Sequence, residues 1–179
     1  MKNTLKFIIS IIVCQMAGVL GSIFTTPAIG GWYAEINKPS FTPSGSFIGL
    51  VWIILFFLMG ISLYLVWSKN WQINIPINRP ERRAWNHFSE KLWSGTWREE
   101  NTIAIFILQL VLNILWSMIF FGLKSPGFAF FELIMLWFAI LYTIANFYRI
   151  SKTAAYLLIP YIFWVSFAGF LNFTIWRMN

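Results

Sequence analysis

Apolar residues gather in five long runs along the chain, separated by segments that carry nearly all of its charge. The runs cover about residues 7–24, 47–67, 102–123, 127–148 and 154–176. Each is close to the roughly 20 residues that an α-helix needs to cross the hydrocarbon core of a bilayer. Backbone in lipid must satisfy its own hydrogen bonds, and no run alternates as a strand would, so each predicts a helix. The pattern predicts an all-α integral membrane protein, a bundle of five transmembrane helices.

The composition agrees with this class. Hydrophobic residues make up 59% of the 179 residues and charged residues 11%, against about 45–50% and 25% in soluble domains. The first run follows Lys2 and Lys6 and so resembles the start of a signal peptide. However, Ala17, Gly18 and Gly21 extend its apolar character to residue 24. We expect it to be retained as the first span of a single membrane domain, residues 1–179.

Positive charge is distributed unevenly between the two sides that five spans would create. Ten of the thirteen Lys and Arg residues fall on the side of the N-terminus: Lys2, Lys6, Lys69, Arg79, Arg82, Arg83, Lys91, Arg98, Arg149 and Lys152. Three fall on the other side: Lys38, Lys124 and Arg177. Because cytoplasmic loops carry the excess of positive charge, this predicts a cytoplasmic N-terminus and an external C-terminus. The same rule accounts for the net charge of +7 without a nucleic-acid partner.

Reactive side chains are few. The chain has no Asp, six Glu, one histidine, His87, and one cysteine, Cys14. A zinc site cannot be built from one Cys and one His, a Ser-His-Asp triad is excluded, and no Gly-rich phosphate loop with its Lys occurs. We therefore expect no metal and no required cofactor. The abundant side chains are eleven Trp and nineteen Phe, so we expect function to depend on aromatic surfaces.

Two connecting segments are more than short links. In residues 25–46, Pro27, Pro39 and Pro43 argue against one continuous helix, and Trp32, Tyr33 and Ile36 could share one face of a short helix. This segment is either an aromatic lid over the bundle or an interfacial anchor, since Trp and Tyr favour that depth.

The second segment, about residues 69–101, carries most of the charge and contains His87. Trp85, Phe88, Leu92 and Trp93 fall at helical spacing within it, which predicts an amphipathic helix on the inner leaflet. A helix that recruits a partner protein is the alternative.

Several polar residues lie within the apolar runs, where they usually face the interior of a bundle. They are Gln15, Gln109, Asn113, Glu132, Asn146, Ser166 and Asn172. Asn113 lies four residues after Gln109 and three before Trp116, so the three share a helix face. Trp164, Ala168, Leu171 and Asn172 form a second stripe. These groups either hold helices together through hydrogen bonds or line a ligand site.

The order of several motifs resembles the translocator protein family, also called tryptophan-rich sensory proteins, which includes the mitochondrial peripheral-type benzodiazepine receptor. The first motifs are Trp32-Tyr33, Lys38-Pro39-Ser40-Phe41-Thr42-Pro43, Val51-Trp52 and Tyr64-Leu65-Val66-Trp67. The later ones are Leu112-Asn113, Trp116, Phe120-Phe121-Gly122, Leu136-Trp137, Pro160-Tyr161, Trp164, Phe167-Ala168, Leu171-Asn172 and Trp176-Arg177. The resemblance covers nearly the whole chain outside residues 69–101, which look like an insertion.

This resemblance implies a pocket in the five-helix bundle, closed by the first loop, that binds porphyrins and, in many members, cholesterol or benzodiazepine-site ligands. The matching pocket positions are Tyr33, Pro43, Trp52, Asn113, Trp116, Trp164, Ala168 and Leu171. Trp52 and Trp164 match the pair that the family associates with light-driven breakdown of protoporphyrin. A flat tetrapyrrole stacks well on such rings.

The sequence departs from the family at a few positions. Ser44 replaces a second proline, Phe128 replaces a residue that is often Trp, and Glu132 stands where Asp is common. Phe173 replaces the Tyr of the cholesterol consensus before Arg177, which weakens the expectation of a sterol partner. The family implies a homodimer, yet the third run has no strong small-xxx-small seam.

Three hypotheses follow. The leading one is a membrane protein that binds protoporphyrin or a haem-like tetrapyrrole in order to sense, sequester or transport it. The second is an enzyme that degrades bound protoporphyrin in light through Trp52 and Trp164. The third is a membrane scaffold that recruits a partner through residues 69–101.

Overall fold

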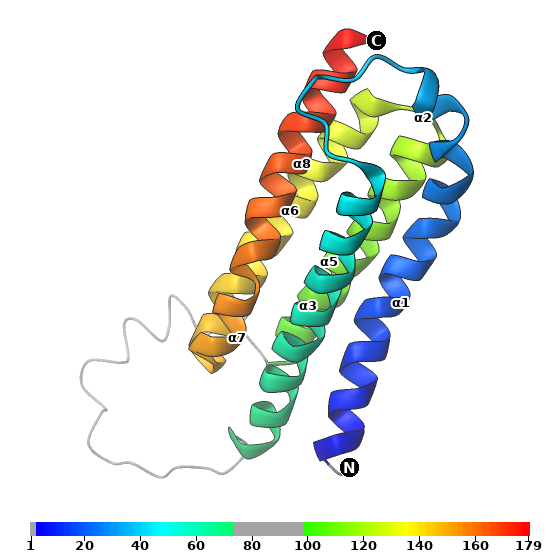
Figure 1. The fold of residues 1–179 in the computed structure, drawn as a ribbon. Coiled ribbons are helices and arrows are strands. Elements are labelled where there is room, and N and C mark those ends of the chain that lie inside the picture. The colour runs from blue at the N-terminus through cyan, green and yellow to red at the C-terminus, as the bar shows by residue number, and fades with distance from the viewer. Residues whose placement is uncertain (1–2, 74–98) are drawn as a thin grey trace, which may run out of the picture.

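The computed structural model describes residues 3–73 and 99–179, and within them five helical segments are long and apolar enough to cross a membrane. They are α1 (Asn3–Ile29), α3 (Gly45–Ile73), α5 (Glu99–Ser117) with the π-helical turn η2 (Met118–Gly122), α6 (Pro126–Ile150), and α7 (Lys152–Leu157) with α8 (Ile159–Met178). The short helix α2 (Trp32–Glu35) lies in the first loop. The two ends of the chain lie at opposite ends of the bundle (Figure 1). The prediction of an all-α bundle of five spans is confirmed.

The first span is longer than its apolar pattern indicated. α1 passes through Pro27 and ends at Ile29, so the expectation that the first loop begins near residue 25 is wrong. A proline in the last turn of a helix removes one backbone donor without breaking the turns before it. In the turn before Pro27, Thr25 donates its hydroxyl to the Gly21 carbonyl at 3.2 Å. The loop proper therefore starts at Gly30.

The fifth span is interrupted near its start, which the continuous apolar run did not indicate. Leu158, between α7 and α8, has φ −90° and ψ −8°, and its N–H donates to the Ala155 carbonyl at 3.1 Å in a tight turn. Pro160 has no N–H to donate to the helical partner four residues earlier, so the ladder breaks at this point.

The second connecting segment is shorter than predicted because α3 continues to Ile73 and α5 starts at Glu99. Residues 74–98, with the predicted amphipathic helix and His87, lie outside the described residues.

α1 and α3 approach each other through glycines. A Cβ on Gly60 would lie 2.7 Å from Cδ1 and 2.9 Å from Cα of Ile11, and a Cβ on Gly18 would lie 2.8 Å from the Phe56 ring. Small residues permit such close packing of backbones in lipid, where dispersion replaces the hydrophobic effect as the force between helices. On the other side of the bundle, α6 packs against both α5 and α8.

Gly60→Ala should destabilise the bundle by about 1–3 kcal/mol, because the added methyl group meets the backbone of Ile11, which cannot move aside as a flexible side chain would. Thermal unfolding in detergent measures the effect. Gly49→Ala on the same helix is the matched control, since a Cβ there meets nothing within 4 Å. Equal unfolding temperatures for the two variants would contradict the close α1–α3 contact.

Candidate ligand-binding site

A cavity of about 940 Å³ lies at the end of the bundle that carries the first loop. Its walls come from α1, α3, α5 with η2, and α8, while residues 33–43 of the first loop cover it. No residue of α6 lines it among the described residues, so α6 supports the walls from behind. The cavity is lined by all eight residues predicted for the site: Tyr33, Pro43, Trp52, Asn113, Trp116, Trp164, Ala168 and Leu171.

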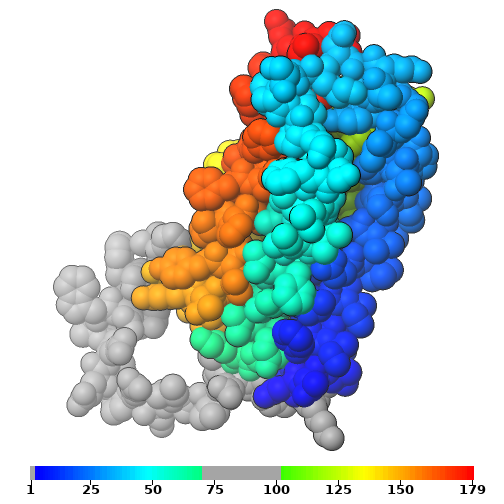
Figure 2. Space-filling view, in the orientation of Figure 1, coloured from blue at the N-terminus to red at the C-terminus, as the bar shows by residue number. Residues whose placement is uncertain are grey.

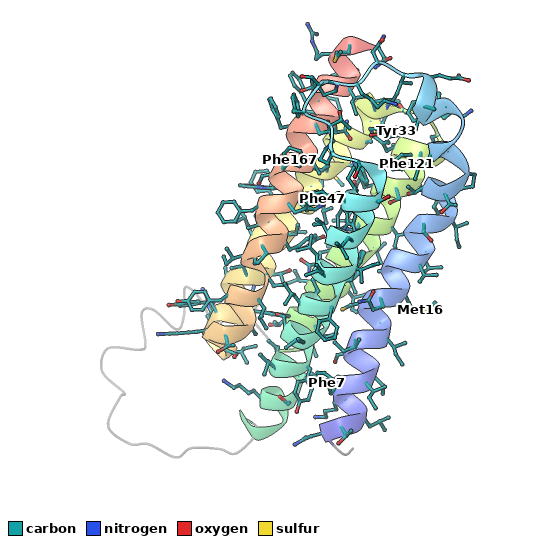
Figure 3. All side chains as sticks on the ribbon, viewed as in Figure 1. Phe7, Met16, Tyr33, Phe47, Phe121 and Phe167 are labelled. Carbon is teal, nitrogen blue, oxygen red and sulfur yellow. The ribbon has the colours of Figure 1, made fainter. Side chains whose placement is uncertain are left out.

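One edge of the loop is attached to η2 by aromatic contacts. Trp32 packs edge-on against Phe120 at 5.8 Å between ring centroids, and Tyr33 packs against Phe121 at 5.4 Å. Figure 3 shows Tyr33 and Phe121 close together at this end of the bundle. Burial raises the pKa of the Tyr33 hydroxyl above its usual value, so this ring stays neutral over a wide pH range. The loop is therefore a folded cover, and the face predicted for Trp32 and Tyr33 packs inward.

The other edge of the loop is attached to α8. Phe41 stacks on Phe170 with centroids 5.3 Å apart and planes 20° apart. The Asn37 N–H donates to Asn179 Oδ1 at 2.9 Å, and Asn179 Nδ2 donates back to the Asn37 carbonyl at 3.0 Å. With the contacts to η2, these interactions hold residues 31–44 across the top of the cavity.

Aromatic side chains fill the space between α3 and α8, which do not pack closely along their lengths. Phe47 lies 6.2 Å from Trp164, and Trp52 lies 6.3 Å from Tyr161, centroid to centroid. At the floor of the cavity, Asn113 Nδ2 donates to the Tyr161 hydroxyl at 3.0 Å. Ring contacts thus take the place of direct backbone packing on this side.

The two predicted pocket tryptophans near α8 differ in their hydrogen bonding. Trp116 Nε1 donates to Asn172 Oδ1 at 3.0 Å, and Asn172 Nδ2 donates to the Pro126 carbonyl at 2.7 Å. Trp164 Nε1 is buried and has no acceptor among the described residues. A buried N–H without a partner is costly, and in a residue that lines a cavity it is a donor that a ligand can use.

The cavity opens sideways between the upper parts of α1 and α3. Val19 and Ile53 line it, yet they are 54% and 60% exposed. Gly45 and Gly49 also line it, and a Cβ on either would meet nothing within 4 Å. Figure 2 shows green atoms from deeper in the bundle between the cyan top of α3 and the blue α1. At the lower end of the opening, Gln15 Nε2 donates to the Ile53 carbonyl at 3.2 Å.

Some lining residues were not predicted for the site. Phe120 and Phe121 reach the loop from η2, where Leu123 N donates five residues back to Met118 O at 2.9 Å. Such π-helical turns are frequent at functional sites, but neither hydropathy nor turn residues reveal them. Ser22 and Thr25 line the cavity from α1. Each follows a glycine, Gly18 or Gly21, at helical spacing, and this stripe of small residues on one face of α1 was visible in the sequence.

The polar residues within the spans fall into three groups. Gln15, Asn113, Ser166 and Asn172 make hydrogen bonds between helices, which is one of the two roles expected from the sequence. Asn146 donates to the Tyr142 carbonyl of its own helix. By contrast, the side-chain atoms of Gln109 and both carboxylate oxygens of Glu132 are buried without a partner within residues 3–73 and 99–179. Asn113 and Asn172 also line the cavity, so one side chain can bond to a neighbouring helix and still face a ligand.

These features define a class: a multi-pass membrane protein whose helix bundle encloses an aromatic-lined cavity beneath a structured loop. The chain belongs to the TspO/MBR family, whose model matches residues 10–177. It is 37% identical to a tryptophan-rich protein TspO of Archaeoglobus fulgidus, over 99% of both chains. It is 32% identical to a translocator protein of Homo sapiens, over 83% of this chain and 75% of that one. It is 28% identical to a protein CrtK of Rhodobacter capsulatus, over 97% and 92%.

Phe41→Ala should loosen the covering loop, because it removes the stacking on Phe170. A stacked aromatic pair contributes about 0.5–1.5 kcal/mol, so backbone amide exchange at Asn37 and Thr42 should speed up by about 2- to 12-fold. Hydrogen–deuterium exchange in detergent measures this. Phe163→Ala, at a lipid-facing position of α8 that is 69% exposed, is the control. Unchanged exchange in Phe41→Ala would show that the stacking does not hold the loop.

Proposed function

We propose that this protein binds planar tetrapyrroles such as protoporphyrin in the cavity beneath the first loop, and that it senses, sequesters or transports them. The observation that carries the proposal is a 940 Å³ space lined by Tyr33, Trp52, Trp116 and Trp164 inside a membrane bundle. Small-molecule sites commonly have volumes of about 300–1,000 Å³ and mostly apolar walls with a few polar groups. Benzodiazepine-site ligands are aromatic and largely apolar as well, and fit the same description.

The shape and chemistry of the walls support a flat aromatic ligand. Trp52 on α3 and Trp164 on α8 both line the cavity, so a macrocycle inside it could stack on either ring. Ala168 is small and leaves room on α8, while the buried Trp164 N–H offers one hydrogen bond to a polar edge. The eight site residues keep the roles that the family resemblance implies, as part of this proposal.

The proposal includes a direction in the membrane. With the N-terminus in the cytoplasm, as the ten-to-three distribution of Lys and Arg favours, the covered end of the cavity faces the outside. Labelling of single cysteines at Ser44 and Lys152 with a membrane-impermeant reagent tests this, after Cys14 is replaced by Ser. If only Lys152→Cys is labelled in intact cells, the protein has the opposite orientation in the membrane. The homodimer stays a prediction that mass measurement in detergent can test.

Ala168→Phe should weaken protoporphyrin binding by at least about tenfold, because the added ring occupies space inside the cavity. Saturable quenching of tryptophan fluorescence during titration with protoporphyrin measures the affinity. Ala145→Phe is the matched control, since Ala145 is exposed on α6 and does not line the cavity. If the wild type shows no saturable quenching at micromolar ligand, the proposed function is wrong.

A second candidate function is light-driven breakdown of bound protoporphyrin by dioxygen, favoured by the presence of two tryptophans, Trp52 and Trp164, in the lining of the cavity. In that case the double variant Trp52→Phe, Trp164→Phe should stop porphyrin bleaching under illumination while most binding remains. Trp137→Phe is the control, since Trp137 donates to Ser166 and lies outside the cavity. Normal bleaching by the double variant would remove both tryptophans from the reaction.

A further inference from the structure

The lining of the cavity has a single charged side chain among the described residues, and it is a cation. Lys38 belongs to the covering loop, and none of the described Glu and Arg residues lines the cavity with it. The remaining lining consists of aromatic and aliphatic side chains with a few neutral polar groups. A half-buried cation beside an otherwise apolar lining attracts a negative group to that end of the cavity.

Lys38 is held in place by neutral groups. Its Nζ donates to the Tyr33 carbonyl at 2.6 Å and to the Ala34 carbonyl at 3.3 Å. It also lies 4.8 Å from the centroid of the Tyr33 ring. Two carbonyls and a ring face orient the ammonium group but cancel none of its formal charge. An ammonium group has three N–H donors, so one remains for another acceptor.

The backbone around Lys38 limits its movement. Pro39 follows it, and the proline ring restricts Lys38 to extended conformations. Pro39 is itself buried. The next turn is closed by Thr42, whose N–H and hydroxyl both donate to the Pro39 carbonyl, at 3.0 and 2.7 Å. No carboxylate pairs with Lys38 in the part of the chain that the structure describes, although Glu35 is only three residues away. Lys38 thus lines the cavity with its ammonium group bonded to two other lining residues, Tyr33 and Ala34, and with no acidic partner among the described residues.

We propose that Lys38 binds a carboxylate of the ligand, so that the site selects planar aromatic molecules that carry an acid at one edge. The acid lies beneath the first loop, and the ring system lies against Trp52 and Trp164. This inference rests on the proposed function and narrows its ligand class to anions. Protoporphyrin, with both its propionate groups on one edge of the macrocycle, has the required form. A hydrogen bond to a charged group in this setting corresponds to a roughly 10- to 100-fold gain in affinity.

Two probes test the proposal: protoporphyrin IX and its dimethyl ester, which has the same macrocycle and no acid. Their dissociation constants are measured by fluorescence quenching for the wild type, Lys38→Met and Lys38→Arg in nanodiscs of zwitterionic lipid. The ratio of variant to wild-type Kd is taken for each probe separately. Because each probe partitions equally into both samples, this ratio isolates the contribution of Lys38.

Lys38→Met should weaken binding of the diacid by about 10- to 100-fold and leave binding of the diester within about twofold. Lys38→Arg should keep most of the affinity for the diacid, since it keeps the charge. Lys124→Met is the matched control, because Lys124 lies on the same end of the bundle but does not line this cavity. Diester binding by Lys38→Met also reports that the variant is folded.

Three outcomes would overturn the proposal. If Lys38→Met binds the diacid as tightly as the wild type does, the proposed function stands and the anion selectivity is wrong. If Lys38→Met loses both probes equally, Lys38 supports the loop and does not recognise the acid. If the wild type binds neither probe, the tetrapyrrole function fails, and this inference fails with it.

Discussion

The covered end of the bundle depends on the buried side chain of Asn172. It is 1% exposed, accepts a hydrogen bond from Trp116 on α5 and donates one to the Pro126 carbonyl at the start of α6. One amide therefore joins three spans at the level of the cavity. In lipid the helices gain little from apolar burial, so hydrogen bonds of this kind, each contributing about 1 kcal/mol, help to fix which helices are neighbours. The position of the Trp116 ring in the wall follows from the same bond.

In this arrangement one helix, α6, supports the bundle, and the other spans line the cavity. α6 packs on α5 and α8 and contributes nothing to the described lining. α3 and α8 are separated, and Phe47, Trp52 and Trp164 occupy the space between them. Cavities persist where their boundaries are held by contacts elsewhere, since packed interiors otherwise close around a void. The aromatic bridges and the loop fixed by Phe41 and Asn37 provide those contacts here.

The hydropathy pattern was sufficient for the five spans because apolar length is a property of the sequence alone. The same pattern did not predict that α1 continues through Pro27 or that the fifth span breaks at Leu158, because both depend on local hydrogen bonding. The α8 stripe from Trp164 to Asn172 was visible as helical spacing, and the structure places it on the cavity. Phe120 and Phe121 were not predicted for the site, because a π-helical turn changes the direction of side chains and the residue composition does not reveal such a turn. The sequence could not separate interhelical bonding from ligand binding, since Asn113 and Asn172 bond to neighbouring helices and also line the cavity.

The side opening between α1 and α3 affects how binding to this protein is quantified. Its rim is formed by residues such as Val19 and Ile53 that are exposed on the lipid-facing surface of the helices. A molecule dissolved among the acyl chains is therefore already next to the cavity, and the concentration that matters is its mole fraction in the bilayer. At a fixed amount of ligand, adding lipid dilutes it in that phase and lowers occupancy even when the aqueous volume is constant. Apparent affinities for this bundle are then properties of protein and membrane together, and they are comparable only at equal lipid content.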